Sequence, residues 1–79
     1  MSDPYRPIDC GEHDRLLDLS TRRRSCALRY RDDSGVVLSL TTHIADVFTR
    51  AGAEFLTTGD GRDIRLDRLI EVDGRVLAE

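Results

Sequence analysis

Several residue types are scarce or missing in this chain of 79 residues, and each absence narrows the range of functions. The chain has no lysine and no tryptophan, only two phenylalanines and two tyrosines, and all 12 of its basic residues are arginine. Because single-stranded RNA is held by base stacking on aromatic side chains, so few rings argue against a dedicated RNA-binding protein. The net charge of −3 argues the same way, since neutralising phosphates requires a basic surface.

Long apolar runs are also missing. No stretch approaches the roughly 18 apolar residues of a membrane span, and the first residues are polar, unlike those of a secretory signal. We therefore expect a cytoplasmic protein without membrane association. A chain of this length forms at most one domain, here residues 1–79, and it has little room for the deep pocket of an enzyme. An enzymatic function is not expected.

Cysteine is rare, with Cys10 and Cys26 as the only thiols. In a cytoplasmic protein both should stay reduced, so we expect no disulfide. Cys10 and His13 have the spacing of half a zinc site, which Cys26 and His43 would have to complete. Because those two residues are far apart in the sequence, structural thiols and surface histidines are the favoured interpretation, and no metal or cofactor is expected.

The chain begins with an extended segment followed by a helix. Pro4 and Pro7 fix the backbone of residues 1–8 in extended geometry, and a helix is predicted over residues 9–22. Asp9 is a favourable N-cap residue, and Glu12, three positions later, fits the reciprocal pattern called a capping box. The buried face of this helix is predicted to consist of three leucines, Leu16, Leu17 and Leu19.

After residue 25 the hydrophobic pattern changes to a period of two, which is typical of strands. Residues 26–31 alternate, "DDSG" predicts a turn, and a second alternation runs from Val36 to Phe48. A strand that long is predicted to bend or bulge. A strand at residues 54–58 and two short strands with a helical kink near Asp67 follow. Together they predict a small barrel or strongly bent sheet over residues 25–77.

Four stretches, taken in this order and spacing, resemble a known family over nearly the full length of the chain. They are "YRPIDC" (residues 5–10), "HDRL" (13–16), "DVFTRAGAEFL" (46–56) and "IRLDRLIEVDG" (64–74). They are similar to the Rof (YaeO) family of Rho-binding antiterminators. The resemblance implies a mainly β fold, a small Sm-like antiparallel β-barrel of four to six strands preceded by one N-terminal α-helix.

The resemblance also implies a function. Members of that family inhibit the transcription termination factor Rho, a hexameric RNA helicase, by binding its N-terminal RNA-binding domain and blocking RNA loading. They do so without a cofactor and are not enzymes. Their contact surface comes from the N-terminal helix and from the loop after the long strand. By position, that surface comprises His13, Asp14, Arg15, Leu17, Asp18, Arg50, Ala51 and Gly52.

The residues alone leave other interpretations open. By themselves the residues favour the solvated side of an amphipathic helix for the stripe that contains Asp14 and Asp18. Carboxylates there could instead bond to the arginine and lysine side chains with which an RNA-binding protein holds phosphate. The alternative function is an Sm-like RNA-binding module, which would rest on residues 22–24 and on Arg29 with Arg31. We expect no direct binding of nucleic acid, and a monomer when the protein is free.

Overall fold

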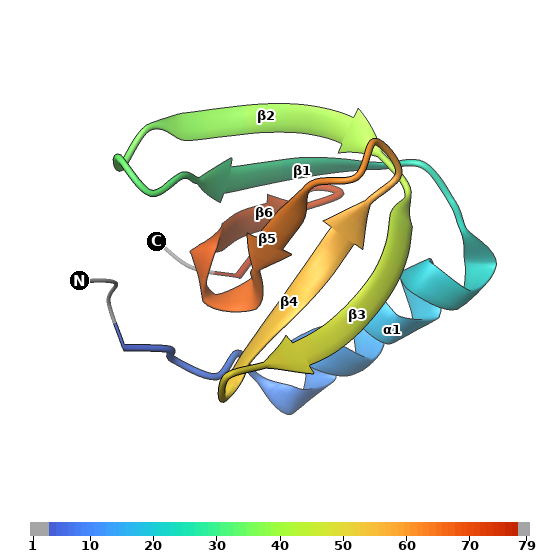
Figure 1. Ribbon diagram of the computed structural model, residues 1–79. Helices are drawn as coiled ribbons and strands as arrows, with labels where there is room; N and C mark the ends of the chain where they lie inside the picture. The colour runs from blue at the N-terminus through green and yellow to red at the C-terminus, as the bar shows by residue number, and fades with distance from the viewer. Residues whose placement is uncertain (1–3, 78–79) are drawn as a thin grey trace.

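The computed structural model describes residues 4–77, in which one α-helix, one 3-10 helix and seven strands are found (Figure 1). The predicted mainly β fold with one N-terminal helix is confirmed. In chain order the elements are α1 (Cys10–Arg22), β1 (Cys26–Arg31), β2 (Val37–Thr42), β3 (Ile44–Arg50), β4 (Ala53–Thr58), β5 (Asp63–Arg65), η1 (Leu66–Arg68), β6 (Leu69–Val72) and β7 (Arg75–Val76).

The strands form two antiparallel sheets, with the orders β2-β1-β6-β7 and β3-β4-β5. Only His43 separates β2 from β3, so one continuous segment crosses from the first sheet to the second. The pairing of β3 with β4 has a bulge between Ile44 and Asp46, directly after this corner. The predicted bend in the long strand is therefore confirmed. The break at His43 and the short strand β7 raise the number of described strands above the predicted four to six.

The corner between the sheets is held by the turn that follows β4. The backbone N–H of Gly59 donates to the carbonyl oxygen of His43 at 2.9 Å and to the hydroxyl oxygen of Thr42 at 3.1 Å. A Cβ atom at position 59 would overlap the His43 ring. A residue with a side chain at position 59 would therefore require the imidazole of His43 to move aside.

The helix is capped at its start by Asp9 as predicted, but Glu12 forms a long-range ion pair in place of the expected capping-box hydrogen bond. The carboxylate of Asp9 accepts from the N–H of Gly11 at 3.0 Å, which makes Asp9 the N-cap. Glu12 does not complete the predicted capping box. Its carboxylate accepts instead from Nε of Arg75 on β7, and Glu12 is buried. This ion pair fastens the first turn of α1 to the end of the first sheet, a contact that local sequence does not show.

The hydrophobic core lies between the helix and the sheets. Leu16 is 1% exposed, whereas Leu17, predicted to share its buried face, is 41% exposed. Consecutive helical residues point about 100° apart, so only one of the two can face the core. Val36, where the second alternation was expected to begin, precedes β2 and is also exposed. The core consists of Leu16, Cys26, Leu28, Tyr30, Ile44, Leu56, Ile64, Leu66, Leu69 and Val72.

The segment before the helix is fastened to the turn η1. The N–H of Arg6 donates to Asp67 at 3.0 Å, and Asp67 forms two further bonds with Arg65, at 2.6 and 2.9 Å. The guanidinium carbon of Arg65 lies 5.9 Å from the ring centre of Tyr5. Burial, followed by the nearby Glu54 and Asp67 carboxylates, raises the pKa of the Tyr5 hydroxyl. Residues 1–3 of the predicted extended lead-in lie outside the described residues.

Helices are short in this fold. The longer one, α1, has 13 residues. Among residues 4–77, no helix combines the length and the apolar character that crossing a bilayer requires.

Candidate protein-binding surface

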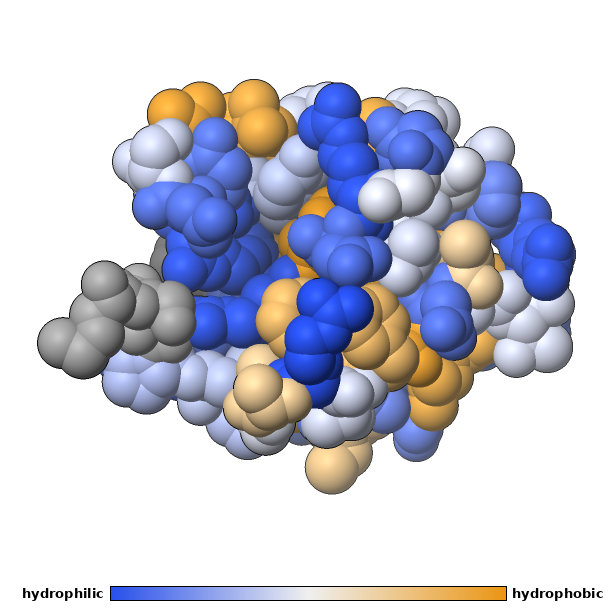
Figure 2. All heavy atoms as spheres, in the orientation of Figure 1, coloured by the Kyte–Doolittle hydropathy of each residue, from blue (hydrophilic) through white to orange (hydrophobic). Residues whose placement is uncertain are grey.

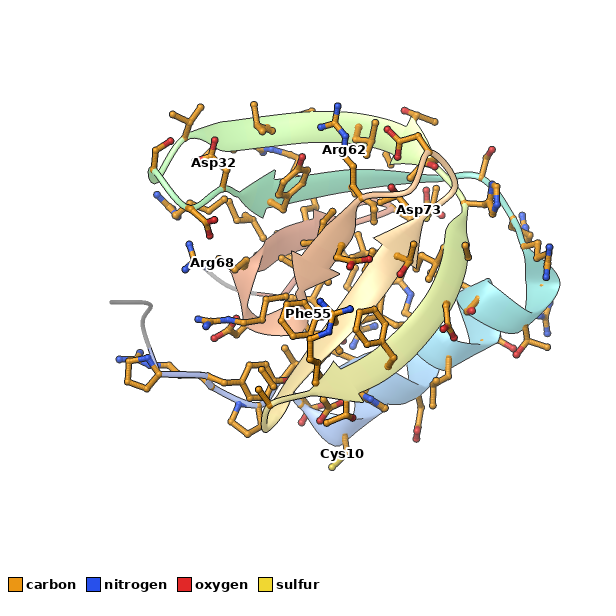
Figure 3. The ribbon with its side chains drawn as sticks, viewed as in Figure 1. Cys10, Asp32, Phe55, Arg62, Arg68 and Asp73 are labelled. Carbon is orange, nitrogen blue, oxygen red and sulfur yellow. The ribbon has the colours of Figure 1, made fainter. Side chains whose placement is uncertain are left out.

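One face of α1 points away from the rest of the protein and carries two of the expected site carboxylates. Asp14, Leu17 and Asp18 are all exposed. Leu17 and Asp18 follow Asp14 by three and four positions, so both side chains are neighbours of Asp14 on the helix surface. Cys10, four positions before Asp14, projects outward at the start of α1 (Figure 3). We call Asp14, Leu17 and Asp18 the acidic helix face.

The two carboxylates of the acidic helix face differ in their partners. Oδ1 of Asp18 lies 3.1 Å from Nε of Arg22, one turn further along α1. Asp14 has no ion pair with any residue in the described range 4–77. The repulsion between Asp14 and Asp18 costs a few tenths of a kcal/mol. Asp14 is therefore the carboxylate that is available to a cation on a partner.

Two other predicted site residues on the helix turn toward the protein. Nε2 of His13 contacts the Glu54 carboxylate on β4, and both side chains are about one-third exposed. Arg15 is partly buried, and its Nη1 atom is buried without a hydrogen-bond partner among the described residues. Burial, then the Asp73 carboxylate, raises the pKa of the Cys26 thiol, and the Arg15 guanidinium partly offsets the rise. His13 and Arg15 thus lie apart from the acidic helix face.

The predicted loop residues form the turn between β3 and β4. Ala51 and Gly52 have φ angles of 51° and 80° and present little side chain. The turn lies beside the first turns of α1 (Figure 1), and the contact between Glu54 and His13 joins the two elements. Backbone groups at Ala51 and Gly52 can thus extend a surface that begins on the helix.

Arg50 points to the other face of this sheet. Its guanidinium carbon lies 5.0 Å from the ring centre of Phe48 and 5.8 Å from that of Phe55, and Nη2 is 3.7 Å from Oδ2 of Asp63. Phe55 follows Glu54 on β4, and successive strand residues point to opposite faces. Because Glu54 contacts the helix, Phe55 and Arg50 lie on the face away from it, which Figure 3 shows for Phe55.

Two aromatic rings stack on that outer face. The ring centres of Phe48 and Phe55 are 5.4 Å apart, and the ring planes meet at 13°. The two residues are direct partners in the pairing of β3 with β4. Sequence reasoning missed this pair because it counted aromatics near the arginine clusters. The signal was the turn at "AG": a hairpin closed there pairs Arg50 with Ala53, and two positions further from the turn it pairs Phe48 with Phe55.

Two open hollows flank the outer face. One, of about 670 Å³, lies between the N-terminal segment and β6, and the other, of about 340 Å³, lies beside Phe55 and Tyr30. Asp32 lines the smaller hollow. Hydrogen bonds from the Ser34 hydroxyl, then from the Val36 N–H, keep the pKa of the Asp32 carboxyl below its usual range. The hollows share Arg31, Arg65 and Arg68, and their carboxylates are Asp9, Asp32, Asp33, Asp63 and Asp67. Both signs of charge are therefore present, in contrast to a uniformly basic groove.

The thiols and histidines do not gather into a metal site. Cys10 is exposed and Cys26 is buried, and both are free. Sγ of Cys26 donates to the carbonyl oxygen of Thr42 at 3.4 Å. Within the part of the chain that the structure describes, no group of three or more His, Cys, Asp or Glu side chains is arranged to hold a metal ion. Cys10, His13, Cys26 and His43 thus keep separate surroundings.

Comparison of the chain with models of known protein families and with curated proteins gives no match in either case.

Proposed function

We propose that this protein is an antiterminator that binds the N-terminal RNA-binding domain of the transcription termination factor Rho and blocks RNA loading. The proposal combines the resemblance of its sequence to the Rof (YaeO) family with the acidic helix face. It places the protein in the cytoplasm of a bacterium, as a protein inhibitor without enzymatic activity or cofactor. The observation that carries it is the exposed carboxylate of Asp14, which has no ion pair within residues 4–77 and lies beside an exposed leucine.

An Sm-like barrel is the fold proposed for the strands, and the path of the chain supports it. Strand β1 pairs with both β2 and β6, and β4 pairs with both β3 and β5. The segment from β2 to β3 passes between the sheets, and η1 leads from β5 in the second sheet back to β6 in the first. Two crossings of this kind are what a small, partly open barrel requires.

The proposed contact combines charge with a small apolar anchor. A protein that binds RNA exposes arginine and lysine side chains, and carboxylates can form charge-assisted hydrogen bonds with those same groups. Asp14 and Asp18 would therefore compete with phosphate. Charge of this kind mainly speeds encounter and selects the partner, whereas affinity comes from buried anchors. Leu17 is the apolar side chain that the acidic helix face offers for this purpose.

Tyr5, Ile8 and His13 are less suited to the role of anchor than Leu17. Tyr5 and Ile8 pack against the core, and His13 is engaged with Glu54. Leu17 lies exposed on the outward side of the helix, beside Asp14 three positions earlier. An apolar contact bordered by polar groups is a common arrangement in a specific interface.

The direct test is binding and inhibition with purified components. The protein should co-elute with the N-terminal domain of Rho in size-exclusion chromatography and should cause read-through at a Rho-dependent terminator in transcription with purified polymerase. Added salt should slow association, because steering by exposed charges is screened. If the protein neither co-elutes with that domain nor causes read-through, the proposal is wrong.

A second candidate, an Sm-like RNA-binding module, is favoured by the Phe48–Phe55 pair. Stacked rings with a neighbouring arginine are a platform on which bases can stack. Fluorescence anisotropy with a single strand of about 12 nucleotides at low salt tests it. Phe55→Ala should then weaken binding about tenfold, and Val76→Ala, on exposed β7, should leave it unchanged. Absence of binding by the wild-type protein excludes this candidate.

A further inference from the structure

Strand β2 is an edge of its sheet that lacks the usual protection. Exposed strand edges are normally blunted by charges, prolines, bulges or shortness, because their free backbone groups can pair with another chain. The sequence of β2, "VLSLTT", has no charge and no proline, and its pairing with β1 is regular over all six residues. In the same molecule, 34% of all residues are charged.

The other edges of the described sheets are protected. Strand β3 carries Asp46 and Arg50 and has a bulge. Strand β5 has three residues, two of them charged, and β7 has two residues. The contrast singles out β2, whose first residue, Val37, is 40% exposed and is preceded by Val36 at 51% exposure. Figure 2 shows hydrophobic residues gathered along this upper margin of the molecule.

The backbone groups of β2 that face outward can be identified. The N–H of Asp32 donates to the carbonyl oxygen of Val36 at 2.9 Å, so Val36 directs its carbonyl toward β1. Backbone direction alternates along an antiparallel strand, so Val37, Ser39 and Thr41 direct their N–H and C=O groups away from β1. The carbonyl of His43, which has the same parity, accepts from Gly59 outside the sheet.

No described strand continues beside those outward groups. The last residue of β4, Thr58, pairs with Ile44, so the second sheet ends where β2 finishes. Within residues 4–77, β2 stands at the end of the order β2-β1-β6-β7. The N–H and C=O groups of Val37, Ser39 and Thr41 are therefore open to a pairing strand.

We propose that β2 pairs antiparallel with β2 of a second copy of this chain. The two-fold axis would pass beside Ser39, so that Ser39 faces its own copy and Val37 faces Thr41, since 37 + 41 = 39 + 39. Each residue pair across the axis exchanges two backbone hydrogen bonds. The outward N–H and C=O groups of Val37, Ser39 and Thr41 would then all be paired. This proposal does not depend on the Rho partner.

A second copy suits this edge better than a foreign segment does. Pairing places Leu38 opposite Leu40, both partly buried at the margin of the core, so each would cover apolar surface of the other. The strand is already extended in the folded protein, so pairing requires no ordering of a flexible segment. An uncharged strand also meets no like charge in its copy, although the whole chain carries −3.

The proposed dimer is closed and weak. A contact about a two-fold axis uses both edges, so assembly stops at two copies. One six-residue strand falls well short of the 1,200–2,000 Å² or so that a stable interface buries. We expect a dissociation constant on the order of 100 µM, so the protein is a monomer when dilute, as the sequence led us to expect.

The test is sedimentation equilibrium of the full chain between about 10 µM and 1 mM, a range that brackets the expected constant. The wild-type mass should rise from monomer toward dimer. Ser39→Lys would place two charges side by side at the axis, and Ser39→Pro would remove an outward N–H, a change that an edge strand tolerates. Both should weaken dimerisation at least tenfold. Ser25→Lys, the same substitution in the exposed link before β1, is the matched control.

Hydrogen exchange gives a second measurement. The outward amides of Val37, Ser39 and Thr41 should exchange more slowly as the concentration of the wild-type protein rises, whereas those of Leu38 and Leu40, already paired with β1, should not change. A monomer at all concentrations, a dimer that Ser39→Lys leaves intact, or assembly beyond two copies would overturn the proposal. Ser39→Lys should bind Rho like the wild type, so failure of either proposal can be told from failure of the other.

Discussion

Reversing the charge at Asp14 should separate binding from folding. Asp14 is exposed on α1, has no ion pair in the described chain and lies one turn before Asp18. Asp14→Arg changes the net charge from −3 to −1, because one negative charge is replaced by one positive charge. The substitution buries nothing and removes no described contact of the wild-type side chain. Its effect should therefore fall almost entirely on the partner.

The expected loss of affinity follows from the contact proposed for this carboxylate. Unit charges 4 Å apart interact by about 4 kcal/mol at an effective dielectric constant near 20, and exposure reduces that figure. Truncating one side of a hydrogen-bonded interfacial pair costs about 2–5 kcal/mol, and reversal adds repulsion. Even 2 kcal/mol weakens binding roughly 30-fold. Isothermal titration of the variant against the N-terminal domain of Rho measures this loss.

The same substitution should leave the folded state as stable as before. It removes the repulsion between Asp14 and Asp18 and supplies Asp18 with a favourable neighbour. Each change stabilises the helix by a few tenths of a kcal/mol. The thermal midpoint, followed by circular dichroism, should stay constant or rise slightly. Asp33→Arg, with the same charge change at a fully exposed turn, removes only a 3.8 Å contact between Asp33 and Arg68 and should bind Rho normally. Equal affinities for both variants and the wild type would refute the role of the acidic helix face.

Three further predictions concern the same helix and the titratable core. Asp18→Ala should weaken Rho binding less than Asp14→Arg, by roughly tenfold in the same titration, because Asp18 already shares its charge with Arg22. Arg75→Ala should lower the free energy of unfolding in urea by about 1–2 kcal/mol, since it removes the partner of the buried Glu12 carboxylate, although exposure of Arg75 reduces the effect. Above pH 9 the thermal midpoint should fall, because the pKa of Cys26 is raised in the folded state and the unfolded chain loses its thiol proton first. Cys26→Ala should remove part of that fall, and an unchanged midpoint up to pH 10 would contradict the assignment.

The fold was largely predictable because most of its signals are local. The alternation in residues 26–31, the turn residues "DDSG" and the kink near Asp67 each lie within a few positions of one another, and the structure has an element at each. The bend at His43 was also predictable, since a strand of that length must curve in so small a protein. Asp9 as the helix cap belongs to the same class of local signal.

The features that sequence reasoning missed involve partners far apart in the chain. Glu12 had a local partner available in the capping box, yet it pairs with Arg75, 63 positions away. Leu17 fitted a leucine-rich face, but helical geometry turns Leu16 and Leu19 toward the core and leaves Leu17 exposed. The candidate site showed the same limit. Its residues were predicted from their positions in the sequence. The direction in which each side chain points, such as that of Arg50 toward the outer face, depends on strand pairing.

The contact between Gly59 and the His43 ring has a consequence for reading mutational data. Position 59 is exposed and lies in a turn, so it looks like a place where any residue would be tolerated. Yet even alanine would push the imidazole out of the corner that joins the two sheets. A saturation scan scored by abundance would therefore show reduced tolerance at an exposed turn residue that lies outside the proposed binding surface. Such a signal reports the architecture of the fold and should not be mistaken for a binding hot spot.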